Sequence, residues 1–407
     1  MLIKYSVENF KSIRDRIELN LEATGISELQ ETIIKHNGDN YLPLAVIYGP
    51  NGGGKSNIIE SLYCLRNRLI VPIVNLLNNK LINNNLSAKM TPFLFNADNI
   101  KKPINFEVIF ANKIGEYKYD VSFKDDIVLN EKLEIIKYKT NKPSLLFNRI
   151  NNDIKLGEEL KNLKVTSAIS KELSVLSFLG YSYKEHEVVK DVMDWWLNKI
   201  DIENYANPIM ESKILDDSDK NIKKMVLQFL NEMDINIKDY TVDKTDLRHI
   251  KIYTTHEVNG YKSTIDFFDE SNGTIKMFTL APSIIFSLLN GTTLVIDEID
   301  AKLHPLLLKH VIEMYNNKES NKRGAQLIFT SHDMTTMTSE LFRRDEIWFA
   351  AKGSSEDTQL YSLVEFKDND GESVRKDAKY NKQYLEGKYG ADPYFKKIIE
   401  WDKITNG

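Results

Sequence analysis

A glycine-rich stretch near the N-terminus has the residue types and spacing of a site for nucleotide phosphates. Within AVIYGPNGGGKSNIIE, residues 45–60, the fixed positions of the pattern G-x-x-x-x-G-K-[ST] are filled by Gly49, Gly54, Lys55 and Ser56. Glycines let the backbone curl so that its N–H groups point at phosphate oxygens. Lys55 is expected to reach the β- and γ-phosphates, and Ser56 to hold Mg²⁺. The predicted nucleotide-binding residues are Asn51, Gly52, Gly53, Gly54, Lys55, Ser56 and Asn57.

An acidic pair far downstream suits the chemistry that such a phosphate loop serves. In GTTLVIDEIDAKLHP, an apolar run ends in Asp297 and Glu298. A carboxylate at the end of a buried strand binds Mg²⁺ through water, and a following glutamate orients and deprotonates an attacking water. The alternative is an acidic strand end that faces solvent. Because the same chain has a phosphate loop, which would bind the nucleotide on which the acidic pair acts, we favour the catalytic interpretation.

Two further polar groups stand at the ends of predicted elements. His332 follows the apolar strand in AQLIFTSHDMTT; alone it would more often be a structural histidine, but its place one strand after the acidic pair favours contact with the γ-phosphate. Ser271, Gly273 and Thr274 form a polar turn that opens an apolar helix, where Ser271 suits an N-cap. A helix start of this kind also binds anions, so we expect it to face a nucleotide held by another subunit.

The elements that must position these residues follow from hydrophobic periodicity. The apolar run before Gly49 predicts a strand buried on both faces, and a helix should follow the loop. The N-terminal residues 1–23 predict two strands, and strict alternation over 104–123 predicts a hairpin with one buried face. Spacing of three and four residues predicts amphipathic helices between 160 and 235, with Trp195 and Trp196 in the core.

Composition sets broad limits on the class of protein. The chain has 407 residues, 42% of them hydrophobic, so it can bury a large core and hold two lobes. Its net charge of -5 argues against a uniformly basic surface, but a local groove that binds nucleic acid is compatible with this charge. A single cysteine, Cys64, excludes an intramolecular disulfide, and the longest apolar run is short for a bilayer. We expect a cytoplasmic protein without a membrane span.

The ordered motifs resemble a known family of ATPases. The stretches VENFKSI, GPNGGGKSN, ESNGT, LVIDEIDAKLHP, FTSHD, RRDEIWFAAK with LYSLVEF, and YLEGKYGADP are similar to ABC/SMC/RecF-like ATPases. They are closest in kind to the bacterial AAA-type ATP-binding proteins of phage-defence and abortive-infection loci. This resemblance implies an α/β P-loop NTPase of ABC/SMC head type, with an antiparallel β subdomain and a helical insertion. It also implies ATP and Mg²⁺ as cofactors and a head-to-tail homodimer.

The resemblance gives each candidate residue a role. Ser56 and Asp297 are the expected metal ligands, and Glu298 and His332 the expected catalytic residues. Ser271, Gly273 and Thr274 are expected to contact the ATP of the partner subunit. Three departures accompany this assignment: the signature is ESNGT rather than LSGGQ, His304 replaces the aspartate found in transporters, and a Q-loop glutamine is not identified. The first departure argues against a transporter. The second means that communication between subunits need not follow the transporter pattern, and the third leaves the coupling to a lid unassigned.

Four segments and three functional hypotheses follow. We expect the ATPase lobe in 1–155 and 241–365, a helical insertion or lid in 156–240, and a C-terminal helix and tail in 366–407. About 75 residues follow His332, which is too few for an appended TOPRIM nuclease. The first hypothesis is therefore a defence sensor or scaffold that works with a separately encoded effector. The alternatives are a RecF-like clamp that binds DNA when ATP closes the dimer, and a regulatory module that holds ATP without turnover.

Overall fold

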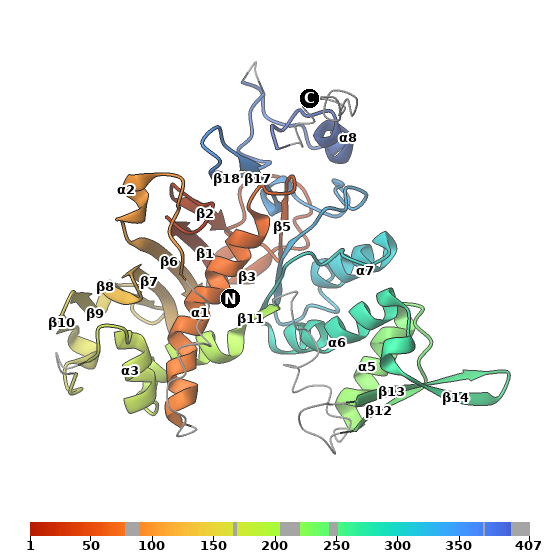
Figure 1. Cartoon of the computed structure of the whole chain (residues 1–407), viewed down its shortest axis with the longest axis horizontal. Coiled ribbons are helices and arrows are strands. Elements are labelled where there is room, and N and C mark those ends of the chain that lie inside the picture. Colours follow the sequence, from red (N-terminus) through yellow and green to blue (C-terminus); the bar gives the residue numbers. More distant parts are fainter. Residues whose placement is uncertain (78–89, 166–168, 204–219, 244–250, 369–370, 392–407) are drawn as a thin grey trace, which may run out of the picture.

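Two large sheets organise the computed structural model, which describes residues 1–77, 90–165, 169–203, 220–243, 251–368 and 371–391 (Figure 1). One sheet has seven antiparallel strands in the order β10-β9-β8-β7-β6-β1-β2. Its strands are β1 (Leu2–Glu8), β2 (Ile17–Asn20), β6 (Ile104–Ala111), β7 (Gly115–Lys124), β8 (Ile127–Lys137), β9 (Pro143–Ile150) and β10 (Asp153–Leu156).

The second sheet carries the nucleotide motifs and has six strands in the order β11-β15-β16-β5-β17-β18. All neighbours are parallel except β17 and β18, which form an antiparallel hairpin at one edge. Its strands are β5 (Leu44–Tyr48), β11 (Ile200–Glu203), β15 (Thr293–Ile296), β16 (Gln326–Thr330), β17 (Ile347–Lys352) and β18 (Thr358–Ser362). Smaller sheets are formed by β3 (Ile34–His36) with β4 (Asp39–Tyr41), and by β12 (Asp239–Asp243), β13 (Lys251–Val258) and β14 (Tyr261–Asp266).

Helices cover both faces of the parallel sheet because alternate residues of its strands point to opposite sides. Ala45 and Ile47 of β5 pack with the helix that follows the phosphate loop, whereas Leu44 and Val46 pack in a second cluster on the other face. The helices are α1 (Lys55–Leu77), α2 (Ala97–Ile100), α3 (Val175–Ser182), α4 (Glu187–Asp194), α5 (Lys220–Glu232), α6 (Asn272–Asn290), α7 (Pro305–Asn316) and α8 (Tyr380–Leu385).

Helix α1 lies between the two sheets and joins them into one core. Its residues Ile58, Leu62 and Leu65 share a buried cluster with Phe106 of the antiparallel sheet and Val295 of the parallel sheet. Figure 1 shows α1 crossing the centre of the molecule, with the antiparallel sheet on one side and α6 and α7 on the other. Helix α1 thus begins at the phosphate loop and packs against both sheets.

Several elements predicted from periodicity are confirmed. The N-terminal pair is β1 and β2, and the alternating hairpin is β6 and β7. The tryptophan pair is core: Trp195 and Trp196 are fully buried, and the ring of Trp195 stacks on Phe110 with 4.1 Å between centroids. These residues lie in a π-helical turn at Trp195–Lys199, directly after α4.

The region 156–240, expected as a helical insertion, is divided between the two halves of the core. Trp196 and Met193 pack in the cluster around α1, whereas Phe229 of α5 packs in the cluster around α6. Between these helices, β11 pairs with β15 and becomes an edge strand of the parallel sheet. Trp196 and Met193 therefore do not share one lobe with Phe229, because a short strand of the main sheet separates them.

Helix α6 is long and apolar enough to cross a membrane by length and composition alone, which other described helices are not. More than half of its apolar window is buried inside the protein, and it contains Pro282. Phe278 and Ile284 of α6 are fully buried in the cluster beneath the parallel sheet. Its hydropathy is that of a core helix.

Candidate functional site

The phosphate loop connects β5 to α1 and depends on glycine at its tightest points. Gly54 has a φ of +99°, and a Cβ there would lie 1.9 Å from Thr358 Oγ1. A Cβ at Gly49 would lie 2.2 Å from the carbonyl oxygen of Ala350. Only glycine combines these backbone angles with so close an approach. The loop therefore packs directly against the β17–β18 hairpin.

A set of hydrogen bonds centred on Ser12 links the loop to distant parts of the chain. Asn57 Nδ2 donates to Ser12 Oγ at 2.6 Å, and Ser12 Oγ lies 2.7 Å from Thr358 Oγ1. The backbone N–H of Thr358 also donates to the carbonyl of Ser12 at 2.7 Å. Asn57 was predicted as a binding residue, and its described contact is with this network. The sequence analysis missed the roles of Ser12 and Thr358, although Ser12 lies in the VENFKSI motif.

Lys55 is buried at the start of α1, and its ammonium is held by backbone carbonyls. Nζ donates to the carbonyl oxygens of Gly49 at 2.8 Å and Pro50 at 3.1 Å. Burial lowers the pKa of Lys55 to about 8, although the charges of Asp297 and Glu298 act to raise it. The result is a desolvated cation inside a loop of amide groups, which is suited to an anionic ligand.

A cavity of about 230 Å³ lies over the loop and brings most predicted residues together. Glu298 and His332 join the loop there, although each comes from a different strand end. The lining residues are Pro50, Asn51, Gly52, Gly54, Lys55, Ser56, Asn57, Glu298 and His332. The parallel pairing of β15 with β16, and of β16 with β5, places all three strand ends at one edge of the sheet.

A neighbouring cavity of about 260 Å³ contains the two predicted metal ligands. Ser56 and Asp297 both line it, together with Glu60 and Tyr63 of α1. A hydroxyl and a carboxylate oxygen are hard donors that suit Mg²⁺, which usually takes its other ligands from phosphates and water. Within the described ranges, no group of three or more His, Cys, Asp and Glu side chains is gathered for a metal ion. The residues present therefore fit Mg²⁺ bound together with a nucleotide.

The acidic pair is held in place by the adjacent strand. Thr330 Oγ1 donates to Asp297 Oδ1 at 2.5 Å and accepts a hydrogen bond from the backbone N–H of Glu298 at 2.7 Å. Glu298 has a φ of +49°, a left-handed conformation in which a non-glycine residue is strained. Asp300 Oδ2 accepts from the backbone N–H of His332 at 3.1 Å. Thr330 and Asp300, which sequence reasoning did not single out, thus tie the acidic loop to the histidine strand.

The signature turn lies outside the cavity of its own chain. Ser271 caps α6: its Oγ accepts from the backbone N–H of Thr274 at 3.1 Å and lies 2.9 Å from Thr274 Oγ1. Ser271 is exposed, and Gly273 packs near the carbonyl of Lys302. The structure therefore confirms the cap, and it does not bring Ser271, Gly273 or Thr274 to the residues around Lys55.

His304, whose role the sequence left open, caps α7. Its Nδ1 accepts a hydrogen bond from the backbone N–H of Leu306 at 3.2 Å. The neutral ring is required for this acceptor role. His304 therefore has a local structural task in the loop after the acidic pair.

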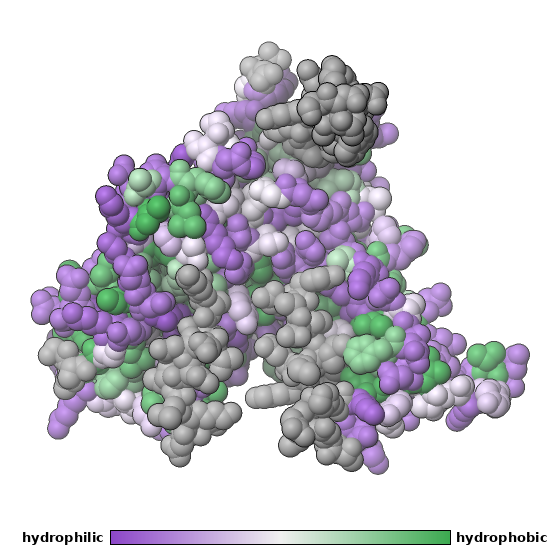
Figure 2. All heavy atoms as spheres, viewed as in Figure 1, coloured by the Kyte–Doolittle hydropathy of each residue, from purple (hydrophilic) through white to green (hydrophobic). Residues whose placement is uncertain are grey.

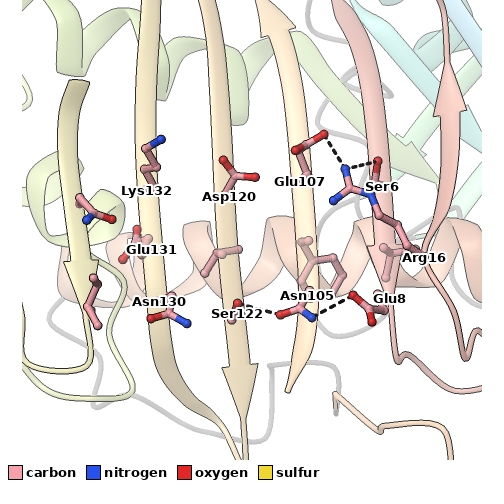
Figure 3. A pocket seen from close by; sticks show the side chains of 15 residues that line it. Ser6, Glu8, Arg16, Asn105, Glu107, Asp120, Ser122, Asn130, Glu131 and Lys132 are labelled. Atoms are coloured by element: carbon pink, nitrogen blue, oxygen red, sulfur yellow. Dashed lines mark hydrogen bonds and ion pairs between the residues drawn. The ribbon is translucent and has the colours of Figure 1, made fainter. Parts of the chain in front are cut away.

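A separate polar cavity of about 440 Å³ lies on the outer face of the antiparallel sheet (Figure 3). There Arg16 donates to Glu107 at 2.7 Å, and Lys118 forms an ion pair with the same carboxylate at 2.8 Å. Although burial acts to raise it, the hydrogen bond from Lys118 and the charge of Arg16 lower the pKa of Glu107. Burial raises the pKa of the neighbouring Asp120 to about 6. Nothing in this cavity matches the nucleotide motifs.

Comparison with known proteins adds a family to this geometry. A protein-family profile described as "AAA domain, putative AbiEii toxin, Type IV TA system" matches residues 44–338. No curated protein matches the chain. Among solved structures, the chain is similar to "Crystal structure of the SmcHead bound to the C-winged helix domain of ScpA". The identity is 14% and the TM-score 0.39, over 89% of this chain and 97% of that chain.

The family match covers the phosphate loop, the acidic pair and His332 and spans more than half of the chain. The predicted α/β fold class is confirmed: a parallel sheet with a phosphate loop is accompanied by an antiparallel β subdomain. The chain belongs to the family of AAA domains whose description names the AbiEii toxin of type IV toxin–antitoxin systems.

Proposed function

We propose that this chain binds ATP with Mg²⁺ and hydrolyses it, as the cytoplasmic ATPase subunit of a phage-defence system. The cavity shared by the phosphate loop, Glu298 and His332 carries the proposal, because a cation, an amide cradle and a candidate base meet there. Membership of a family described with an abortive-infection toxin supports the defence role. The effector is proposed to be a separately encoded protein, such as a TOPRIM-type nuclease.

Each side chain in the cavity has a proposed task. Lys55 exchanges its carbonyl partners for the β- and γ-phosphates, and the loop N–H groups bind the remaining phosphate oxygens. Ser56 and Asp297 hold Mg²⁺, which neutralises phosphate charge when bound. Glu298 orients the attacking water and accepts its proton, and His332 contacts the γ-phosphate.

The exposed signature turn supports a homodimer with ATP at the interface. Each chain has one phosphate loop with its cavity and one signature turn at Ser271, which does not line that cavity. In a two-fold symmetric dimer each contact occurs twice, so two composite sites form. In the proposed dimer, Ser271, Gly273 and Thr274 of one copy face the phosphates bound at Lys55 of the other.

Mixing two inactive variants tests this arrangement. Lys55→Ala removes the near half of both sites, and Ser271→Arg blocks the far half of both, so each homodimer should lack ATPase activity. In a mixed dimer both lesions fall in one site, and the other site is built from intact halves. We expect mixing to restore ATP hydrolysis or the trapping of one ATP per dimer. Neither outcome, despite confirmed mixed dimers, would place the whole site within one chain.

A DNA clamp is the second candidate, and a basic cavity favours it. A cavity of about 400 Å³ near the end of α7 is lined by Lys35, Lys318, Lys322 and Arg323, and its lining contains no Asp or Glu among the described residues. Such a surface attracts phosphate backbones even on a chain with net charge -5. ATP-dependent DNA binding with a steep salt dependence would support the clamp. Normal ATP affinity without phosphate release would instead indicate a regulatory module.

A further inference from the structure

The start of α6 rests on the loop that follows the acidic pair in the same chain. Lys302 Nζ lies 3.4 Å from Asn272 Oδ1, and a Cβ added at Gly273 would lie 3.3 Å from the carbonyl oxygen of Lys302. One turn further along the helix, Lys276 Nζ donates to the backbone carbonyl of Glu298 across 3.5 Å. The helix that begins at the signature turn is therefore in contact with the loop of the proposed base.

Lys276 is a half-buried lysine that faces several carboxylates. Burial lowers the pKa of Lys276, while the charges of Asp300, Glu298, Asp297 and Glu203 act to raise it. Glu203 reaches this group from the end of β11, the strand next to β15. An ammonium in such surroundings interacts more strongly with its neighbours than one in water, because the effective dielectric constant is lower. Replacing Lys276 should therefore disturb the loop that contains Asp297 and Glu298.

The backbone of Glu298 is held on both sides. Its N–H donates to Thr330 Oγ1 at 2.7 Å, and its carbonyl accepts from the backbone N–H of Ala301 at 3.1 Å and from Lys276 at 3.5 Å. These contacts support a φ of +49°, which a glutamate seldom adopts without such support, and Lys276 supplies the side-chain contact to the carbonyl. Since the backbone angles set the direction of the side chain, losing the contact from Lys276 should move the carboxylate relative to the cavity over the phosphate loop.

We propose that Lys276 is a positioning residue that connects the first turn of α6 to the orientation of Glu298. This inference rests on the proposed function, in which Ser271 at the same helix start contacts the nucleotide of a second copy. When that nucleotide fixes Ser271, α6 is fixed, and Lys276 then holds Glu298 of its own chain in the working orientation. Nucleotide bound at one site of the dimer thereby orients Glu298 at the other site.

The test compares Lys276→Met with Lys276→Arg. Methionine has a similar length without the charge or the donor, so kcat for ATP should fall by at least about tenfold, the scale of a misplaced catalytic group. The Kd for ATP, measured by calorimetry, should stay within about twofold, because Lys276 does not line the cavity. Arginine keeps a donor and a charge and should restore most of kcat. Lys309→Met, on the exposed side of α7, is the matched control and should leave kcat unchanged.

A double variant decides whether Lys276 acts through Glu298. If it does, Lys276→Met combined with Glu298→Gln should be no slower than Glu298→Gln alone in single-turnover assays, because both changes disable the same group. Multiplied losses would overturn the proposal, as would an unchanged kcat in Lys276→Met. If methionine lowers the melting temperature, Lys276→Gln takes its place in both assays. If the wild-type protein and Lys276→Met both hydrolyse ATP at the normal rate, only this inference is refuted. If the wild-type protein itself does not hydrolyse ATP, the proposed function is refuted.

Discussion

Two regions of the molecule gather charged side chains, and they pair them in different ways. On the outer face of the antiparallel sheet, Glu107 has an ion pair with Arg16 at 2.7 Å (Figure 3). It has a second ion pair with Lys118 at 2.8 Å. At the edge of the parallel sheet, Lys55 donates to the carbonyls of Gly49 and Pro50 instead. The carboxylates near Lys55 act on it through their charge, and not through a described hydrogen bond.

The difference separates a structural polar surface from a binding site. Opposite charges in contact satisfy each other, so the outer face retains little attraction for a ligand. A buried ammonium held by neutral carbonyls keeps its charge for an anion that can replace them. Figure 2 shows hydrophilic side chains over much of the visible face, so polarity alone does not mark the site. The binding site is distinguished by the way in which its charged groups are paired.

Lys55→Ala should break this comparison most completely. Because the ammonium is the cation at the centre of the phosphate loop, its loss should abolish ATP binding and hydrolysis while the fold is retained. Calorimetry with ATP and Mg²⁺ measures the binding. Lys118→Ala, which removes a cation from the outer face, is the matched control and should bind ATP normally. Equal ATP affinity for wild type and Lys55→Ala would contradict the assignment.

Glu298→Gln should separate binding from chemistry. The amide keeps the size of the side chain but cannot accept the proton of water, so hydrolysis should fall by at least roughly a hundredfold. ATP and Mg²⁺ should still bind, and an ATP-closed dimer should accumulate. Phosphate release and light scattering measure the two effects, and Glu107→Gln on the outer face serves as control. If turnover were unchanged, the base would lie elsewhere, and His332 would be tested next.

Gly54→Ala sharpens the comparison at the level of the backbone. The new Cβ would lie 1.9 Å from Thr358 Oγ1 at a φ of +99°, so the loop must shift. We expect the ATP affinity to fall by about tenfold, because correctly placed loop N–H groups bind the phosphates. Gly260→Ala has a comparable φ of +79° without a neighbour within 4 Å. This control should show a small loss of stability and normal ATP affinity; a matching loss of affinity in both would show that the contact with Thr358 is irrelevant.

Asp120→Asn tests the outer face, with the smallest expected effect. Burial raises the pKa of Asp120 from 3.8 to about 6, so folding favours the protonated carboxyl, and this stability is lost as the pH rises through about 6. Asparagine stays neutral, so its melting temperature should exceed that of wild type by about 1 to 2 °C at pH 8 and match it near pH 4. Thermal melts at several pH values measure this. A difference independent of pH would mean that Asp120 does not titrate in this range.

The sequence predicted the parts of the site that depend on local pattern. Gly54, Lys55 and Ser56 were found because a phosphate loop needs adjacent residues in fixed order, and Glu298 and His332 because each follows a buried strand. The strand pairing that unites them is a property of the folded chain and is seen in the sheet order. The roles assigned to the residues in ATP binding and hydrolysis remain predictions, as do the four segment boundaries.

The parts that escaped prediction depend on contacts between distant residues. Thr358 meets Ser12 and Gly54 only because β18 folds back beside the loop, and no local signal marks such a residue. Strand β11 has only Ile200–Glu203 and lies between helical segments, so its apolar pattern is too short to separate from theirs. Lys276 stands in a helix that the sequence marks as apolar, and its contact with Glu298 appears only in the folded chain.

The hydrogen bonds of Ser12 with Asn57 and Thr358 are complete only after Thr358 has been synthesised, which limits when the site can form. The phosphate loop is synthesised early, and the β17–β18 hairpin that packs against it follows roughly three hundred residues later. The contacts between the loop and the hairpin are therefore very distant in sequence. During synthesis the loop should lack the contact with Thr358 until β18 emerges. The capacity to bind ATP should therefore appear late in translation, and truncated chains that end before Thr358 should remain without it.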